Sequence, residues 1–115
     1  MTKYIFSILC DPSQMECVVK IGHAVEYAKK LKKMGHEVYL FFDGLGTRAL
    51  APQGIIAKFM EEAVKEGLIY GACGYCASPN HVNVKPTINV RLLGDENNHI
   101  GVEELVDKGY QLVIV

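Results

Sequence analysis

Apolar residues in the first half of the chain alternate between stretches typical of strands and stretches with helical spacing. Lys3–Leu9 is rich in Tyr, Ile and Phe and predicts a buried strand. Residues 18–31 then carry apolar side chains at helical spacing, which predicts a helix. His36–Phe42 predicts a second strand, and Asp43–Gly46 predicts a turn after it.

The second half repeats this alternation. Its predicted elements are a helix over 53–66 that Gly67 closes, strands at Leu68–Ala72, Thr87–Leu93 and Leu112–Val115, and a short helix over 101–108. Strands that alternate with helices are typical of βαβ units. The sequence therefore predicts one α/β domain spanning 1–115, a sandwich with a mostly parallel five-stranded sheet.

Composition narrows the function classes. The chain has 115 residues, enough for one core, and its net charge of −1 gives no argument for binding nucleic acid or an anionic membrane. No segment approaches the roughly 18 apolar residues of a membrane span. The first apolar stretch is too short for a signal peptide, so we expect a cytoplasmic protein with reduced thiols. The four cysteines (10, 17, 73 and 76) are then structural thiols, metal ligands or reactive groups rather than a disulfide framework.

Cys73 and Cys76 form a CxxC directly after the third predicted strand. Ligands of open α/β sheets gather at the carboxyl ends of the strands, and Asp43-Gly44 should lie at the same edge, after strand two. Thiolate is the reactive form of cysteine, and small residues let a partner approach it. Cys73 and Cys76 are the candidate catalytic residues, although two cysteines that serve only as small buried hydrophobic side chains would give the same pattern. The candidate binding residues are Asp43, Gly44, Gly74 and Tyr75.

Two other uses of the CxxC remain open. Zinc needs four ligands, and Cys73, Cys76 and His81 offer three in one loop. The fourth would have to come from Cys10, Cys17 or His23. Because the chain has no second ligand pair, we predict no metal site and no cofactor. A thioredoxin-like dithiol needs a long helix after the CxxC, and Pro79 opposes one.

Two stretches resemble the DsrE/DsrF-like family of sulfur-relay proteins. Gly35-His36-Glu37-Val38, followed by Phe41-Phe42 and Asp43-Gly44, is similar to the family's second strand. Ala72-Cys73-Gly74 is similar to its active-site signature after strand three. The order of strands and helices also fits over nearly the whole chain. This resemblance implies a three-layer α/β sandwich that assembles into homotrimers or homohexamers.

The resemblance also implies a function. In sulfur-relay members a cysteine after strand three carries a persulfide, and Cys73 matches it by position. Cys76 departs from the family pattern, because many members have no second cysteine there. We therefore predict a cytoplasmic sulfur carrier or sulfurtransferase that works between a protein donor and a protein acceptor, without direct contact with nucleic acid or membrane. The alternatives are a dithiol oxidoreductase or redox sensor, a non-catalytic oligomer subunit, and a small zinc-binding module.

Overall fold

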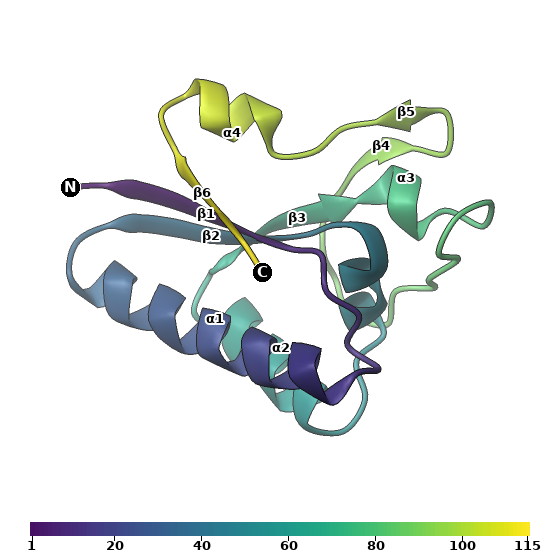
Figure 1. Cartoon of the computed structure of the whole chain (residues 1–115), viewed down its shortest axis with the longest axis horizontal. Coiled ribbons are helices and arrows are strands. Elements are labelled where there is room, and N and C mark those ends of the chain that lie inside the picture. Colours follow the sequence, from purple (N-terminus) through teal and green to yellow (C-terminus); the bar gives the residue numbers. More distant parts are fainter.

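The fold consists of one sheet with helices on both faces, described here by a computed structural model of residues 1–115 (Figure 1). Its elements, in chain order, are β1 (Lys3–Ile8), α1 (Met15–Lys33), β2 (Glu37–Phe42), the 3-10 helix η1 (Gly44–Leu50), α2 (Ile55–Lys65), β3 (Ile69–Cys73), α3 (Gly74–Ala77), β4 (Leu92–Asp95), β5 (Asn98–His99), α4 (Glu103–Asp107) and β6 (Gln111–Ile114). The strands and helices alternate, which confirms the predicted α/β class. No helix combines the length and the apolar character that a membrane crossing requires.

The sheet has six strands in the order β5-β4-β3-β2-β1-β6. The strands β4, β3, β2, β1 and β6 are neighbours in that order and are all parallel. Only β5 is antiparallel to its neighbour, β4. The helices α1 and α2 form the crossovers of two successive parallel pairs, β1–β2 and β2–β3. The prediction of five strands is therefore wrong by one, because β5 lies between the predicted strand that ends at Leu93 and the predicted helix that begins at residue 101.

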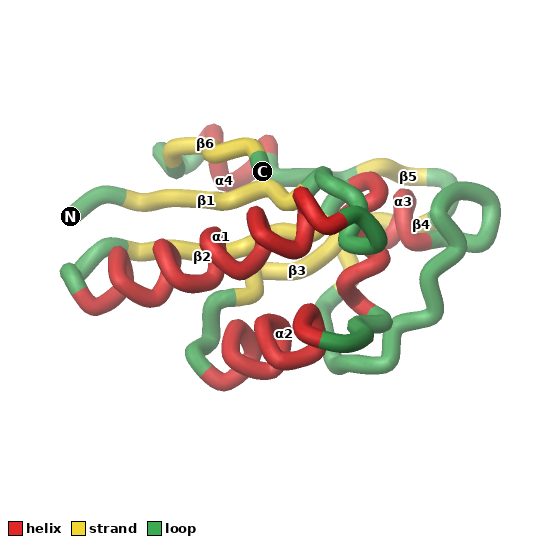
Figure 2. The backbone as a smooth tube through the Cα atoms, turned by 60° about the horizontal axis from the view of Figure 1, so that its bottom comes forward, coloured by secondary structure: helices red, strands yellow, loops and turns green.

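The two faces of the sheet carry cores of different size. α1 and α2 lie together on one face, whereas α4 covers the other (Figure 1, Figure 2). The first face holds a cluster of 18 buried residues, which includes Ile21 of α1 and Phe42 of β2. The second holds four buried residues, among them Phe41 and Cys73. Successive side chains of a strand point to opposite faces, so Phe41 and Phe42 enter different cores.

Several predicted boundaries differ from the structure. The turn predicted at Asp43–Gly46 is the beginning of η1, in which the Thr47 hydroxyl donates to the Gly44 carbonyl. The strand predicted at Thr87–Leu93 begins only at Leu92. The preceding residues Ile88 and Val90 pack against the main core without belonging to a strand. Their alternation thus reflects partial burial against the core rather than pairing within the sheet.

Cys10 and Cys17 form a disulfide, with their Cα atoms 5.4 Å apart. It links the segment after β1 to the first turn of α1, where Cys17 is 2% exposed and belongs to the main core. The prediction that all four cysteines are free thiols or ligands is therefore wrong for this pair. Cys73 and Cys76 are free, as predicted.

Candidate functional site

The candidate site lies at the carboxyl ends of β2 and β3. Asp43 follows β2 directly, and Cys73 is both the last residue of β3 and the N-cap of α3, the short helix that contains Cys76. β2 and β3 are parallel neighbours, with Phe42 opposite Ala72, so the residues that follow them are brought together. The structure thus brings together Asp43 and both candidate catalytic cysteines, as the strand order predicts.

One carboxylate oxygen organises the site. The Cys76 thiol donates a hydrogen bond to Oδ1 of Asp43 at 3.2 Å, and the Gly44 N–H donates to the same oxygen at 2.9 Å. The Cys76 N–H donates to Sγ of Cys73 at 3.3 Å. Cys73, Cys76 and Asp43 are therefore linked by a continuous set of polar contacts, of which two come from backbone N–H groups.

His99 is the member of the site that the sequence did not predict. Its Nε2 lies 3.7 Å from Oδ1 of Asp43. One ligand-type atom from each of Asp43, Cys73, Cys76 and His99 lies within 4.8 Å of the other three. His99 stands 23 positions after Cys76 in a two-residue strand, so neither spacing nor periodicity marks it. Only the fold of the β4–β5 hairpin brings it to the thiols.

Gly74 fixes the distance between the hairpin and the CxxC. α3, β4 and β5 lie together at one end of the sheet (Figure 2). A Cβ atom added to Gly74 would lie 2.5 Å from the Gly94 carbonyl oxygen, a backbone atom that cannot rotate away. The side chain of His99 reaches the site because these two backbones approach so closely. Gly74, a predicted binding residue, therefore acts as a spacer.

Burial raises the pKa of the Cys76 thiol to about 12. The neighbouring Cys73 sulfur and the carboxylate of Asp43 contribute to this rise, because both disfavour a negative charge on Cys76. The backbone N–H of Gly44 acts in the opposite direction. At neutral pH Cys76 is consequently a thiol that donates to Asp43, and it is the less reactive form of cysteine.

Access to the site is unequal for the two sulfurs. Cys73 is completely buried, whereas Cys76 is half-buried. An open cleft of about 600 Å³ reaches the site beside α4, and Asp43 and His99 line it together with Glu103 and Asp107. No lysine or arginine lines this cleft. Hydrogen bonds from the Gly101 N–H lower the pKa of Glu103, so the approach to the site is negatively charged.

Tyr75 separates two histidines. Its ring stacks on His81, with centroids 4.0 Å apart, and meets His99 edge to face at 5.2 Å. His81 also bonds through Nδ1 to the Ser78 hydroxyl at 2.8 Å. His81 therefore lies behind Tyr75 and outside the ligand cluster. The other residues considered as a fourth zinc ligand are also excluded, since Cys10 is bonded to Cys17 and His23 contacts the Val19 carbonyl.

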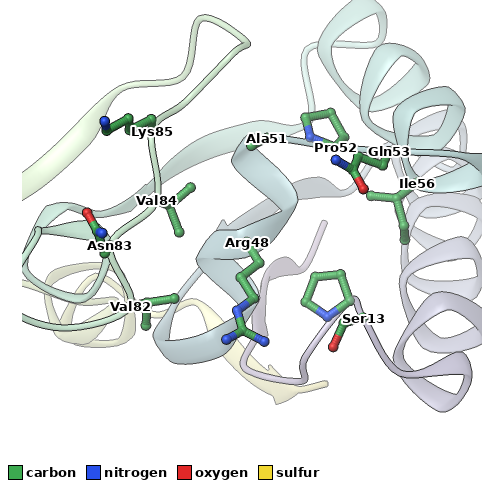
Figure 3. A pocket seen from close by; sticks show the side chains of 11 residues that line it. Ser13, Arg48, Ala51, Pro52, Gln53, Ile56, Val82, Asn83, Val84 and Lys85 are labelled. Atoms are coloured by element: carbon green, nitrogen blue, oxygen red, sulfur yellow. The ribbon is translucent and has the colours of Figure 1, made fainter.

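A second cavity of about 490 Å³ lies elsewhere (Figure 3). It is lined by Arg48 of η1, Ile56 of α2 and the segments 12–13, 51–53 and 82–85, and no cysteine or histidine lines it. Its arginine, Arg48, is paired with Asp11 at 2.8 Å. We assign it no part in the thiol site.

No protein-family model, no curated protein and no solved structure matches this chain. The chemistry of the site is therefore inferred from its own residues. Two thiols, a carboxylate and an imidazole can perform thiol exchange or hold a soft divalent metal ion.

Proposed function

We propose that this protein is a sulfur carrier that holds a persulfide on Cys73, with Cys76 as the second thiol. The observation that carries the proposal is the meeting of these two free sulfurs at the carboxyl edge of the sheet, while the other two cysteines are bonded to each other. The resemblance to DsrE/DsrF-like sulfur-relay proteins supports the choice of Cys73, which ends the third strand. A protein donor would supply the sulfur and a protein acceptor would remove it.

The chemistry is two successive exchanges. The Cys73 thiolate attacks the outer sulfur of a donor persulfide, R–S–SH, which gives Cys73–S–SH and releases the donor as R–S⁻. An acceptor thiolate then attacks the outer sulfur and regenerates the Cys73 thiolate. Alternatively, the Cys76 thiolate attacks the inner sulfur, which closes a Cys73–Cys76 disulfide and expels HS⁻. In that branch the two thiolates supply the electrons that reduce the sulfane sulfur.

The burial of Cys73 sets a condition for this reaction. A donor cannot reach its sulfur while it stays buried in the small core, where Leu105 of α4 and Leu93 of β4 pack with it. The β4–β5 hairpin contributes only two residues as β5, and its turn lies at Glu96-Asn97, so little packing opposes its displacement. On this proposal a docking partner would have to displace the hairpin or α4 to reach Cys73, which would link sulfur transfer to recognition of the partner.

A dithiol oxidoreductase is a weaker second candidate. The proximity of the two sulfurs favours it, because a disulfide could close after a small movement. The α3 helix is only four residues long, however, and ends before Pro79. The long helix that follows a thioredoxin-like CxxC is therefore missing. The two candidates differ in whether Cys76 is required for the first reaction with sulfur.

The test is intact-mass analysis after exposure to polysulfide. It uses the chain with Cys10→Ser and Cys17→Ser, so that reduction acts only on the remaining pair. We expect this protein to gain one sulfur that a reductant removes, the added Cys76→Ser variant to load and hold it longer, and the added Cys73→Ser variant to load none. Equal loading without Cys73 would contradict a Cys73 carrier. Loss of two hydrogens without any gain of sulfur would favour the dithiol oxidoreductase.

We also propose that the chain assembles into homotrimers or homohexamers, as the resemblance to a three-layer family fold implies. The structure supports a role for β6, an edge strand in which Leu112, Val113 and Ile114 are all exposed. Apolar residues on an unpaired edge are suited to association. Light scattering should give a mass of three or six chains at micromolar concentration, and a strict monomer would contradict the assembly.

A further inference from the structure

We infer that the reduced protein binds one zinc ion, whose four ligands are Asp43, Cys73, Cys76 and His99. This site is separate from the sulfur-carrier proposal, because metal binding neither requires nor produces a persulfide. It also differs from the zinc site considered from the sequence, in which His81 stood in the place that the fold gives to His99 and the fourth ligand was sought among Cys10, Cys17 and His23.

The four ligand atoms already lie close enough together to share one ion. Zinc–sulfur and zinc–nitrogen bonds of about 2.3 and 2.0 Å place tetrahedral ligands roughly 3.3–3.8 Å apart. Oδ1 of Asp43 lies 3.2 Å from Sγ of Cys76 and 3.7 Å from Nε2 of His99. All four atoms lie within 4.8 Å of one another. Closing the set around an ion therefore needs movements of about one ångström or less for most pairs.

The types of ligand select the class of metal. Two thiolates with an imidazole and a carboxylate suit zinc, whereas magnesium and calcium prefer oxygen ligands. Backbone hydrogen bonds already orient two of the four ligands, from the Cys76 N–H to Cys73 and from the Gly44 N–H to Asp43. Such outer contacts hold ligands in the geometry a metal needs. Four protein ligands leave no open position, which is typical of a structural zinc site.

The charges around the site favour a cation. Asp43 has no ionic partner except His99, and no lysine or arginine lines the adjoining cleft. Glu103 and Asp107 add two further carboxylates to that cleft. A divalent ion would offset the repulsion between Asp43 and two thiolates while joining β2, β3, α3 and β5 at one point. The hairpin that carries His99 would then be fixed to the CxxC.

The test is a titration with the metal alone. It uses the 115-residue chain with Cys10→Ser and Cys17→Ser, without a histidine tag, reduced and freed of metal. Cobalt(II) should bind once per chain and give the strong visible absorption of tetrahedral cobalt with a thiolate charge-transfer band. Zinc should then displace it stoichiometrically. His99 is exposed on the surface, so His99→Ala should fold normally, which circular dichroism checks.

His99→Ala should weaken zinc binding by at least about 10–100-fold, measured against a chromophoric chelator, since even outer-shell losses reach that range. His81→Ala is the matched control, because it removes a neighbouring histidine outside the cluster, and it should bind zinc like the parent. A missing tetrahedral cobalt spectrum, an unchanged affinity in His99→Ala, or an equal loss in His81→Ala would each overturn the site.

The same variants separate this inference from the proposed function. The metal-free His99→Ala protein should still load sulfur from polysulfide, because its two thiols are intact. A cobalt spectrum without any sulfur loading would contradict the carrier and leave the metal site standing. Sulfur loading without the cobalt spectrum would contradict the metal site and leave the carrier standing.

Discussion

The two cysteine pairs of this chain lie in similar places but in different surroundings. Each begins near the carboxyl end of a parallel strand, Cys10 after β1 and Cys73 at the end of β3. Cys17 enters the large core under α1 and is bonded to Cys10, whereas Cys73 lies in the small core on the opposite face. There it faces a carboxylate, an imidazole and a second free thiol.

The compartment expected for the protein therefore does not predict the state of all four cysteines. A cytoplasmic location predicts free thiols throughout, yet one pair is bonded. The cytoplasmic location itself stays a prediction. The polar groups that the fold brings to Cys73 and Cys76 make that pair the candidate reactive pair.

The largest expected effect is on stability, and it concerns the Cys10–Cys17 pair. Replacing Cys10 and Cys17 together by serine should lower the free energy of unfolding by about 2.5 kcal/mol, because the disulfide closes a loop with a sequence separation of 7. Denaturant unfolding measures this change. Sulfur loading should persist in the same variant, and an unchanged unfolding midpoint would contradict a stabilising role for this pair.

Gly74→Ala should disturb the site of Cys73 and Cys76, because it changes the distance between the CxxC and the β4–β5 hairpin. The added methyl group would meet the Gly94 carbonyl at 2.5 Å, so the β4–β5 hairpin must shift, at a cost of about 1–3 kcal/mol. Since the hairpin carries His99, the affinity for zinc should fall together with stability. Unfolding and chelator competition test both effects, and a variant that matches the parent in both would show that the close approach is unimportant.

A smaller effect concerns protonation in the metal-free, reduced protein. Because the pKa of Cys76 is raised to about 12, its alkylation should be slow at pH 8 and accelerate as the pH rises toward that value. Asp43→Asn removes one of the groups that raise this pKa, so alkylation at pH 8 should become severalfold faster. Mass spectrometry of the Cys76 peptide gives the rate.

The matched control is Asp11→Asn, whose carboxylate pairs with Arg48 outside the site and should leave the rate unchanged. The sign of the linked stability change also follows. The folded protein keeps the Cys76 proton between the ordinary pKa of 9.0 and about 12, whereas the unfolded chain loses it. Stability should therefore fall as pH rises through this window. Equal alkylation rates for Asp43→Asn and the parent would contradict the contact with Asp43.

Much of the fold could be predicted because burial leaves a periodic pattern. The parallel strands β1, β2 and β3 are continuous apolar runs, and the helices between them bury residues at helical spacing. β5 has two exposed polar residues, so it leaves no such pattern. The disulfide also escaped prediction, since the spacing of Cys10 and Cys17 does not show that the turn before α1 brings them together.

The candidate site was predicted only where chain order determines it. Asp43 and Cys73 end neighbouring parallel strands, so their proximity follows from topology. His99 belongs to a hairpin whose position depends on the tight contact between Gly74 and Gly94, and nothing local in the sequence reports that contact. His81 is closer in sequence but turns to Ser78 and Tyr75 instead.

The most direct measurement maps the position of the added sulfur in the wild-type chain. The protein is exposed to polysulfide without reductant, alkylated to trap persulfides, digested, and analysed peptide by peptide. We expect the added sulfur on the Cys73 peptide, with Cys10 and Cys17 still linked to each other. Added sulfur on the Cys10 or Cys17 peptide, or none on Cys73, would contradict the assignment of the reactive pair to the edge of β2 and β3.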